Sequence, residues 1–351
     1  MRTLHVIRLG SSARFSALLD HALSDLPVTC LKLSDIENGL RNAPVLFALQ
    51  IDAYGESEEF HTLLRLLRKN PECLNGCIGG IIVDGDSELY TKAAAQSLTL
   101  AANLAGCTFP GKPLVEGTGS LYNQHILAKR LNLNWEQTYF LRARDLCERL
   151  IQIALPRFSS PKLLMLHASD QQHSNTVWMG REILSRLPSA IRTQEMSLQN
   201  GTVFDCRGCS YDSCLHFAQN GRCFYGGAVS EAVLPAIADC DAMLFLCPNY
   251  NDALSANLSA LINRLTNLLL KQDLSEKYLF GIVVSGYSGS DLVARQLLGG
   301  MCLNKAAILP SNFCLLHTAH DPGSAKTSIG IAQKLDAFAS HIQTTLLGYG
   351  F

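Results

Sequence analysis

The sequence predicts an α/β protein built from two doubly wound parallel-sheet domains in tandem. Short apolar runs alternate with segments of helical periodicity along the chain, a pattern typical of a parallel sheet with crossover helices. The 351 residues suffice for two domains that each bury a core. Hydrophobic residues make up 48% of the chain and charged residues 17%, which argues against disorder.

The second half contains four apolar runs that we interpret as strands: Leu163–Ala168, Ala242–Cys247, Phe280–Ser285 and the weaker Phe313–Leu316. A helix is expected between the second and third of these strands. It is predicted because one apolar stripe with helical spacing runs along Leu254, Leu258, Leu261, Leu265 and Leu268.

The first half resembles a weaker copy of the second. Met243–Cys247 follows the similar segment Val45–Leu49 by 198 positions, and Gly281–Gly286 follows the similar segment Gly80–Gly85 by 201 positions. A nearly constant offset over two strands and their connecting helix predicts a tandem duplication.

The second half also carries an insertion. Its first strand follows the first strand of the chain, Leu4–Leu9, by only 159 positions, so about 39 extra residues precede Met243. A helix over Arg144–Leu155 is expected to end at Pro156, and Ser159–Pro161 forms a linker. We therefore predict a domain over residues 1–156 and a second domain over residues 161–351.

The charge balance excludes several functions. Lys and Arg number 29 and Asp and Glu number 30, so there is no electrostatic footprint for nucleic acid or an anionic membrane. The apolar runs are far shorter than a membrane span, and the first ten residues are too short for a signal peptide. A cytoplasmic protein is expected.

A polar loop, Ser169–Thr176, joins the strand Leu163–Ala168 to a helix predicted over Val177–Leu187. Such a loop places backbone N–H groups and hydroxyls at a helix N-terminus, where the helix dipole favours an anion. The alternative interpretation is that Ser174 or Asn175 only caps the helix.

Two further loops follow the next two strands. Cys247–Ser255 contains the letters PNYN, and Ser285–Gly289 reads SGYSG. In a doubly wound sheet, ligands bind at the carboxyl ends of the strands. The order of the three loops over residues 162–318 resembles the flavodoxin-like NAD(P)H-dependent FMN reductases and their iron–sulfur flavoprotein relatives. The resemblance implies two tandem flavodoxin-like domains, of which the first is degenerate.

The resemblance also implies an FMN site in the second domain, with NAD(P)H as the co-substrate. The first loop would hold the phosphate through Ser169, Gln171, Ser174, Asn175 and Thr176. The second would lie along the ribityl chain and the flavin ring through Pro248, Asn249, Tyr250 and Asn251. The third would face the pyrimidine edge through Ser285, Gly286, Tyr287, Ser288 and Gly289.

Four of the thirteen cysteines are clustered in the insertion: Cys206, Cys209, Cys214 and Cys223. Four thiols within 18 residues reach the density of metal ligands. Iron–sulfur flavoproteins carry a compact four-cysteine motif in this region that binds a [4Fe–4S] cluster, with tighter gaps than here. Three alternatives stay open: an iron–sulfur cluster, no metal, or a zinc ion.

Two smaller groups receive structural interpretations. Asp84, Asp86 and Glu88 resemble a cation site, but we interpret Asp86 or Ser87 as a helix cap with Glu88 in the first turn. His317 and His320 have no partner at a meaningful spacing, so we interpret both as ordinary loop or surface residues.

The predicted function is that of an FMN-dependent NAD(P)H oxidoreductase, a flavin or quinone reductase or an electron-transfer flavoprotein. The flavin performs the chemistry, and a small-molecule acceptor or a redox protein takes the electrons. Segments 10–16 and 52–57 lack the SNT and PNY features, so one FMN per chain is expected. The two domains would form an internal pseudo-dimer, with further homo-oligomers left open. The alternative is a non-catalytic flavin- or metal-binding redox sensor that uses the Cys206–Cys223 cluster.

Overall fold

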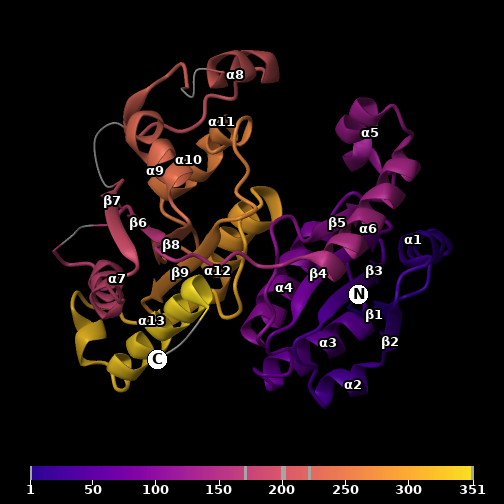
Figure 1. Cartoon of the computed structure of the whole chain (residues 1–351), viewed down its shortest axis with the longest axis horizontal. Coiled ribbons are helices and arrows are strands. Elements are labelled where there is room, and N and C mark those ends of the chain that lie inside the picture. The colour runs from indigo at the N-terminus through magenta and orange to yellow at the C-terminus, as the bar shows by residue number, and fades with distance from the viewer. Residues whose placement is uncertain (1, 170–171, 199–202, 220–222, 349–351) are drawn as a thin grey trace. The chain divides into compact units, whose positions relative to one another are not determined.

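The computed structural model describes residues 2–169, 172–198, 203–219 and 223–348. The chain forms two compact units, each of which is described by itself (Figure 1). The first unit extends to Ala154 and includes Pro310–Asn312, and the second unit holds the rest of the chain from Leu155.

The first unit contains a five-stranded parallel sheet in the order β2-β1-β3-β4-β5. Its strands are β1 (Leu4–Leu9), β2 (Val28–Leu31), β3 (Pro44–Ile51), β4 (Ile78–Gly85) and β5 (Leu114–Gly117). Every residue of β3 and β4 except Gln50 is buried, as expected for central parallel strands that helices cover on both faces.

Helices cover both faces of this first sheet (Figure 1). One face carries α1 (Ala13–Leu23) and α6 (Trp135–Gln152), and the other carries α3 (Glu58–Lys69) and α4 (Thr91–Leu104). Shorter elements complete the unit: α2 (Leu33–Glu37), η1 (Tyr122–Gln124) and α5 (His125–Leu131).

The second unit contains another five-stranded parallel sheet, in the order β7-β6-β8-β9-β10. Its strands are β6 (Lys162–His167), β7 (Arg192–Ser197), β8 (Ala242–Pro248), β9 (Tyr278–Ser285) and β10 (Cys314–Thr318). Counted within each unit, both sheets have the order 2-1-3-4-5, which is that of flavodoxin-like domains. The predicted fold class is therefore confirmed, while the common origin of the two halves stays a prediction.

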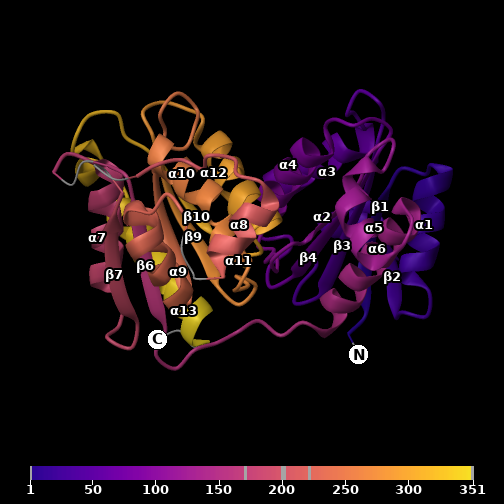
Figure 2. The ribbon, with the colours of Figure 1, turned by 90° about the horizontal axis from the view of Figure 1, so that it is seen from above.

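The second sheet also lies between two helical layers, which separate clearly in Figure 2. On one face, α7 (Asn175–Arg186) and α13 (Ile331–Leu347) share an apolar core with β6, β8 and β9. The other face carries α9 (Leu234–Asp239), α10 (Ala256–Arg264) and α12 (Ser290–Leu298). The remaining elements are α8 (Tyr211–Ala218), η2 (Val229–Val233), α11 (Thr266–Leu269), η3 (Gly299–Asn304) and η4 (Ser324–Thr327).

Some predicted elements have different bounds in the structure. The helix expected from Arg144 begins at Trp135, because Asn134 and Gln137 form a capping box that fixes its start. The predicted leucine stripe is divided between α10 and α11, which meet at Leu265. These differences do not change the topology.

The interpretation of Asp86 or Ser87 as a helix cap is wrong. Helix α4 begins only at Thr91, after Tyr90 in a left-handed conformation with φ of 75°. The Glu88 carboxylate instead accepts a hydrogen bond from the backbone N–H of Ser120 at 2.7 Å, which ties two loops of the first unit together. The sequence pattern of a helix cap is short and polar. A loop whose polar side chains bind another loop has the same pattern, so the sequence alone does not distinguish the two.

Within the described residues, none of the helices has the length and apolar character needed to cross a membrane.

Candidate functional site

A pocket of about 360 Å³ lies in the second unit, among the loops that follow β6, β8, β9 and β10. These are the carboxyl ends of the parallel strands, and the order of the sheet reverses between β6 and β8. Ligands of doubly wound sheets bind at this place. The lining residues are His173, Ser174, Asn175, Thr176, Pro248, Asn249, Tyr250, Val284, Gly286, Ala319, His320 and Pro322.

The structure brings together seven of the predicted site residues, from all three loops: Ser174, Asn175, Thr176, Pro248, Asn249, Tyr250 and Gly286. Ser169, Asn251, Ser285, Tyr287, Ser288 and Gly289 belong to the same loops but do not line the pocket. Gln171 lies outside the described residues. Their contacts with FMN stay predictions.

Two side chains of the first loop have structural partners at the start of α7. The Ser174 hydroxyl caps the helix by accepting a hydrogen bond from the Val177 N–H at 3.3 Å, and it lies 2.7 Å from the Thr176 hydroxyl. Asn175 donates to the carbonyl of Asp321 at 2.9 Å and so holds the loop after β10 beside the helix. Ser174 therefore caps α7 and also lines the pocket, and the interpretation that it serves only as a cap stays a prediction.

Ser169, the first residue of this loop, differs from the others. Its side chain is 2% exposed, and its hydroxyl has no hydrogen-bond partner among the described residues. A buried polar atom without a partner destabilises a folded protein and calls for an explanation. A ligand with acceptor oxygens, such as a phosphate, would give this hydroxyl a partner.

Asn249 connects the second and third loops. Its amide nitrogen donates to the Ser285 hydroxyl at 3.1 Å and to the Ser288 carbonyl at 2.9 Å, while its amide oxygen accepts from the Asp252 N–H at 2.7 Å. Gly289, with φ of +84°, leaves no space for a side chain beside Asp252. The two loops are thus held in one arrangement.

We expect the Asn249→Ala substitution to weaken FMN binding about tenfold or more, because it removes hydrogen bonds that hold both loops. The thermal midpoint of the protein should fall as well. Fluorescence titration of FMN measures the affinity. Asn263→Ala is the matched control, since that amide contacts Asp205 in the insertion and does not line the pocket. Equal affinities for the two variants would contradict this role of Asn249.

Two aromatic side chains lie near the mouth of the pocket. The rings of Tyr287 and His320 are 4.7 Å apart, and the tyrosine hydroxyl lies 3.3 Å from Nε2 of the histidine. His317 is a buried residue of β10, so its interpretation as a loop or surface residue is wrong, whereas His320 lies in a loop, as interpreted, and lines the pocket. The sequence could not identify it, because only the fold brings the loop after β10 to this edge.

Among the described residues that line the pocket there is no Lys or Arg. An anion at the first loop would therefore meet hydroxyls and the N-terminus of the 12-residue helix α7. The titratable side chains of the lining are His173, His320 and Tyr250.

The four clustered cysteines are free thiols around the start of α8. Cys206 and Cys209 are exposed, and burial together with the neighbouring Cys206, Cys223 and Cys209 thiols raises the pKa of Cys214. The thiols are thus neighbours. Nevertheless, no three His, Cys, Asp or Glu side chains of the described residues form a group that could hold a metal ion. The arrangement does not fit a metal centre, and we derive no step through one.

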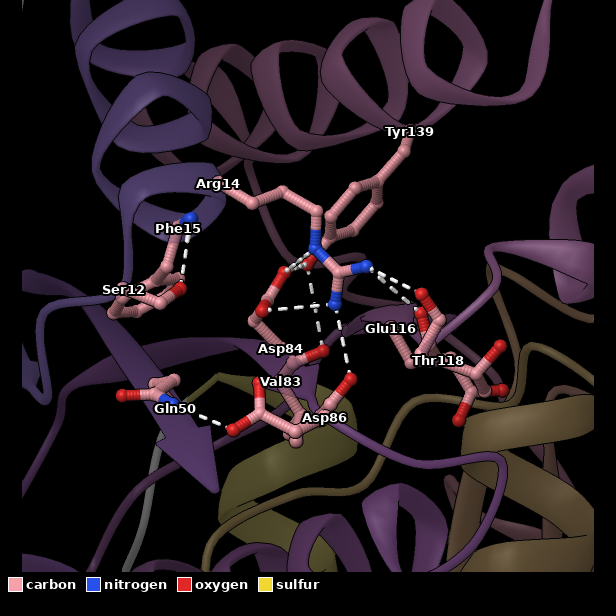
Figure 3. A network of polar contacts seen from close by, with 12 residues as sticks. Ser12, Arg14, Phe15, Gln50, Val83, Asp84, Asp86, Glu116, Thr118 and Tyr139 are labelled. Carbon is pink, nitrogen blue, oxygen red and sulfur yellow. Dashed lines mark hydrogen bonds and ion pairs between the residues drawn. The ribbon is translucent and has the colours of Figure 1, made fainter. Parts of the chain in front are cut away.

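The corresponding edge of the first unit is filled by its own side chains (Figure 3). Arg14 extends from α1 to Asp84 at the end of β4. Its Nε donates to Oδ2 of the carboxylate and its Nη2 donates to Oδ1, both at 3.0 Å. The guanidinium also donates to the carbonyls of Gly85, Thr118 and Gly119 at 2.9–3.1 Å. The Tyr139 hydroxyl donates to the same carboxylate at 3.2 Å.

This cluster holds a charged pair. Burial lowers the pKa of Arg14, but the hydrogen bond and charge of Asp84 more than offset it and raise that pKa above its usual value. Burial raises the pKa of Asp84, against the lowering effects of Arg14 and Tyr139. Because both carboxylate oxygens accept guanidinium N–H groups, the site holds the ionised carboxylate at neutral pH.

A second contact fills the loop after β1. The backbone N–H of Gly10, at the position of the phosphate loop in the second unit, donates to the Glu59 carboxylate at 2.8 Å. A carboxylate there occupies the donor that a phosphate would use and repels a further anion.

Solved structures of other proteins resemble part of this chain. The structure of a putative quinone reductase from Klebsiella pneumoniae is 16% identical over 53% of this chain and 85% of its own, with a TM-score of 0.39. An FMN-dependent NADH-azoreductase from Bacillus anthracis is 12% identical over 52% of this chain and 99% of its own, with a TM-score of 0.36. No curated protein sequence matches the chain at a significant level.

The family comparison is more specific. The model of the NADPH-dependent FMN reductase family matches residues 161–321. This segment contains β6, all four strand-end loops of the pocket and the cysteine insertion. Residues 161–321 of the chain therefore match the NADPH-dependent FMN reductases, as the three loop motifs predicted.

Proposed function

We propose that this protein is an FMN-dependent NAD(P)H oxidoreductase with a single flavin site, in its second unit. The observation that carries the proposal is the buried, unpartnered hydroxyl of Ser169 at the start of the predicted phosphate loop. It supports a ligand with acceptor oxygens at the edge where the family match and the pocket coincide.

The residues of the pocket fit FMN in chemical character. Hydroxyls and a helix N-terminus suit a phosphate, and Asn249 holds the second and third loops together beside the pocket. Gly286 lines the pocket, and a Cβ there would lie 2.9 Å from Nδ1 of His320, so the packing of this ring favours glycine at this position.

Bound FMN would supply the hydride and electron chemistry, which the protein itself does not need to perform. The residues of the chain have positioning roles. The first loop holds the phosphate, Asn249 fixes the two loops beside the ring, and Tyr250, 54% exposed, presents an aromatic face at the mouth. No catalytic side chain is assigned.

One flavin per chain is part of the proposal. The filled edge of the first unit supports it, because Arg14 and Glu59 use the groups that a cofactor would need. Flavin released by heat from protein reconstituted with excess FMN should amount to one equivalent. Two equivalents would contradict the single site.

The proposal is tested by the visible spectrum of the anaerobically purified protein and by its bleaching with NADPH or NADH. We expect two resolved flavin bands that a nicotinamide bleaches. A protein that is colourless after FMN is added and unbound FMN is removed by gel filtration would favour the alternative, a sensor module that uses the Cys206–Cys223 cluster. Iron, sulfide and zinc analysis of the same sample tests whether that cluster binds a metal.

A further inference from the structure

His167 is a buried titratable residue at the start of the phosphate loop. It is the last residue of β6, two positions before Ser169, and it is 0% exposed. Its Nε2 lies 3.2 Å from a carboxylate oxygen of Glu195 on β7. The two Glu195 oxygens also accept from Arg181 on α7, at 2.7 and 3.0 Å. Polar contacts thus connect β6, β7 and α7 through His167, Glu195 and Arg181.

The other ring nitrogen is not satisfied. Nδ1 of His167 is buried and makes no hydrogen bond among the described residues, although the backbone of Ser169 lies close enough to favour the charged ring. The unpartnered Ser169 hydroxyl lies two residues further along the chain. Two buried polar groups at the start of the predicted phosphate loop therefore lack partners among the described residues.

The charges around His167 determine its state when no ligand is bound. Burial lowers the pKa of His167, and the raising effects of Glu195 and the Ser169 backbone do not offset it. The hydrogen bond and charge of Arg181 lower the pKa of Glu195, against its burial, so this carboxylate is ionised. Arg181 and Glu195 neutralise each other, and the imidazole between them and the loop is neutral at neutral pH.

A phosphate dianion would change this balance. None of the described lining residues is a Lys or Arg, so the loop offers an arriving phosphate no permanent cation. A nearby anion favours the charged form of a histidine. We propose that His167 takes up a proton when the phosphate of FMN binds, and so supplies the positive charge that the phosphate loop lacks. This inference rests on the proposed function, since it assigns a binding residue to the same site.

Proton uptake makes affinity depend on pH with a defined sign. FMN should bind more weakly as pH rises, by up to about tenfold per pH unit for one proton. The titratable groups that face this region are Glu195 from β7, Arg181 from α7 and His173 from the loop itself. Of these, His173 lines the pocket and is therefore the control position for substitution.

The test is the affinity for FMN and for riboflavin between pH 7 and pH 8.5, measured by quenching of flavin fluorescence in a non-phosphate buffer. The phosphate of FMN is already a dianion in this range, since its second pKa is about 6. Riboflavin is the matched ligand because it lacks only the phosphate. We expect the wild-type affinity for FMN to fall with pH while that for riboflavin stays constant.

Variants identify the residue. His167→Asn should remove the pH dependence of FMN binding, whereas His173→Gln should keep it. The wild-type comparison of the two ligands needs no variant, so it remains decisive if His167→Asn does not fold. Equal pH dependence for both ligands, or a dependence that persists in His167→Asn, would overturn the inference alone. Failure of FMN to bind at any pH would overturn the proposed function together with the inference.

Discussion

The Asp84→Ala substitution is expected to destabilise the first unit by about 3 kcal/mol, because it leaves a largely buried guanidinium without its carboxylate. Asp84 is 1% exposed and Arg14 is 24% exposed at their side chains. The carboxylate accepts from two guanidinium nitrogens and from the Tyr139 hydroxyl, and so joins β4 to α1 and α6. Its loss removes three hydrogen bonds at once.

The measurement is scanning calorimetry with and without FMN. A loss of about 3 kcal/mol corresponds to a fall of about 10 °C in the midpoint of a unit of this size. Bound FMN stabilises only the unit that holds it, by about 2.7 kcal/mol at 100 times the dissociation constant. The lowered transition in Asp84→Ala should therefore be the one that FMN does not raise.

Asp86→Asn is the matched control for this prediction. Asp86 lies two residues further along the same segment and is exposed. Its carboxylate accepts one long hydrogen bond, from the Gln50 amide at 3.4 Å. A change within about 0.5 kcal/mol is expected, as for most surface substitutions. If the two variants are equally stable, the Arg14–Asp84 pair does not hold the first unit together.

The strands were the most predictable part of the fold. β1 has the predicted bounds, and β6, β8 and β9 differ from the prediction by a few residues, because central parallel strands are nearly continuous apolar runs. β7 was not predicted. Most of its residues are exposed, so it lacks the apolar pattern that reveals a strand.

The loops that follow the strands were predictable as a group but not in their contacts. The sequence places polar residues after β6, β8 and β9, and the topology brings these loops to one edge. It does not reveal that Arg14 meets Asp84, which lies 70 positions further along, or that His320 lies in the pocket. Such contacts depend on which loops the folded chain brings together, and the spacing of residues in the sequence does not predict them.

The Ser169→Ala substitution is expected to weaken FMN binding about 10- to 100-fold, since a hydrogen bond to a charged group contributes about 1.5–3 kcal/mol. The same substitution should leave the stability of the FMN-free protein unchanged or slightly increased. Its hydroxyl is buried and has no partner among the described residues, so removing it breaks no contact of the folded chain and relieves an unsatisfied group.

The matched control is Ser255→Ala, because Ser255 is another buried serine whose hydroxyl lacks a partner among the described residues. It is the N-cap residue of α10, at the end of the second loop, and it does not line the pocket. Fluorescence titration with FMN and riboflavin separates the two positions. Ser169→Ala should lose affinity for FMN and keep its affinity for riboflavin, whereas Ser255→Ala should keep the ratio of the two affinities.

The combination of the two readouts distinguishes a ligand-binding hydroxyl from a structural one. A serine that stabilises the fold lowers the midpoint of the free protein when it is replaced, and any effect on flavin follows from that loss. Replacing a serine that binds a phosphate leaves the stability of the free protein unchanged and removes only the phosphate-dependent part of the affinity. If Ser169→Ala lowers the midpoint but binds FMN as tightly as the wild type does, the loop after β6 is not a phosphate site.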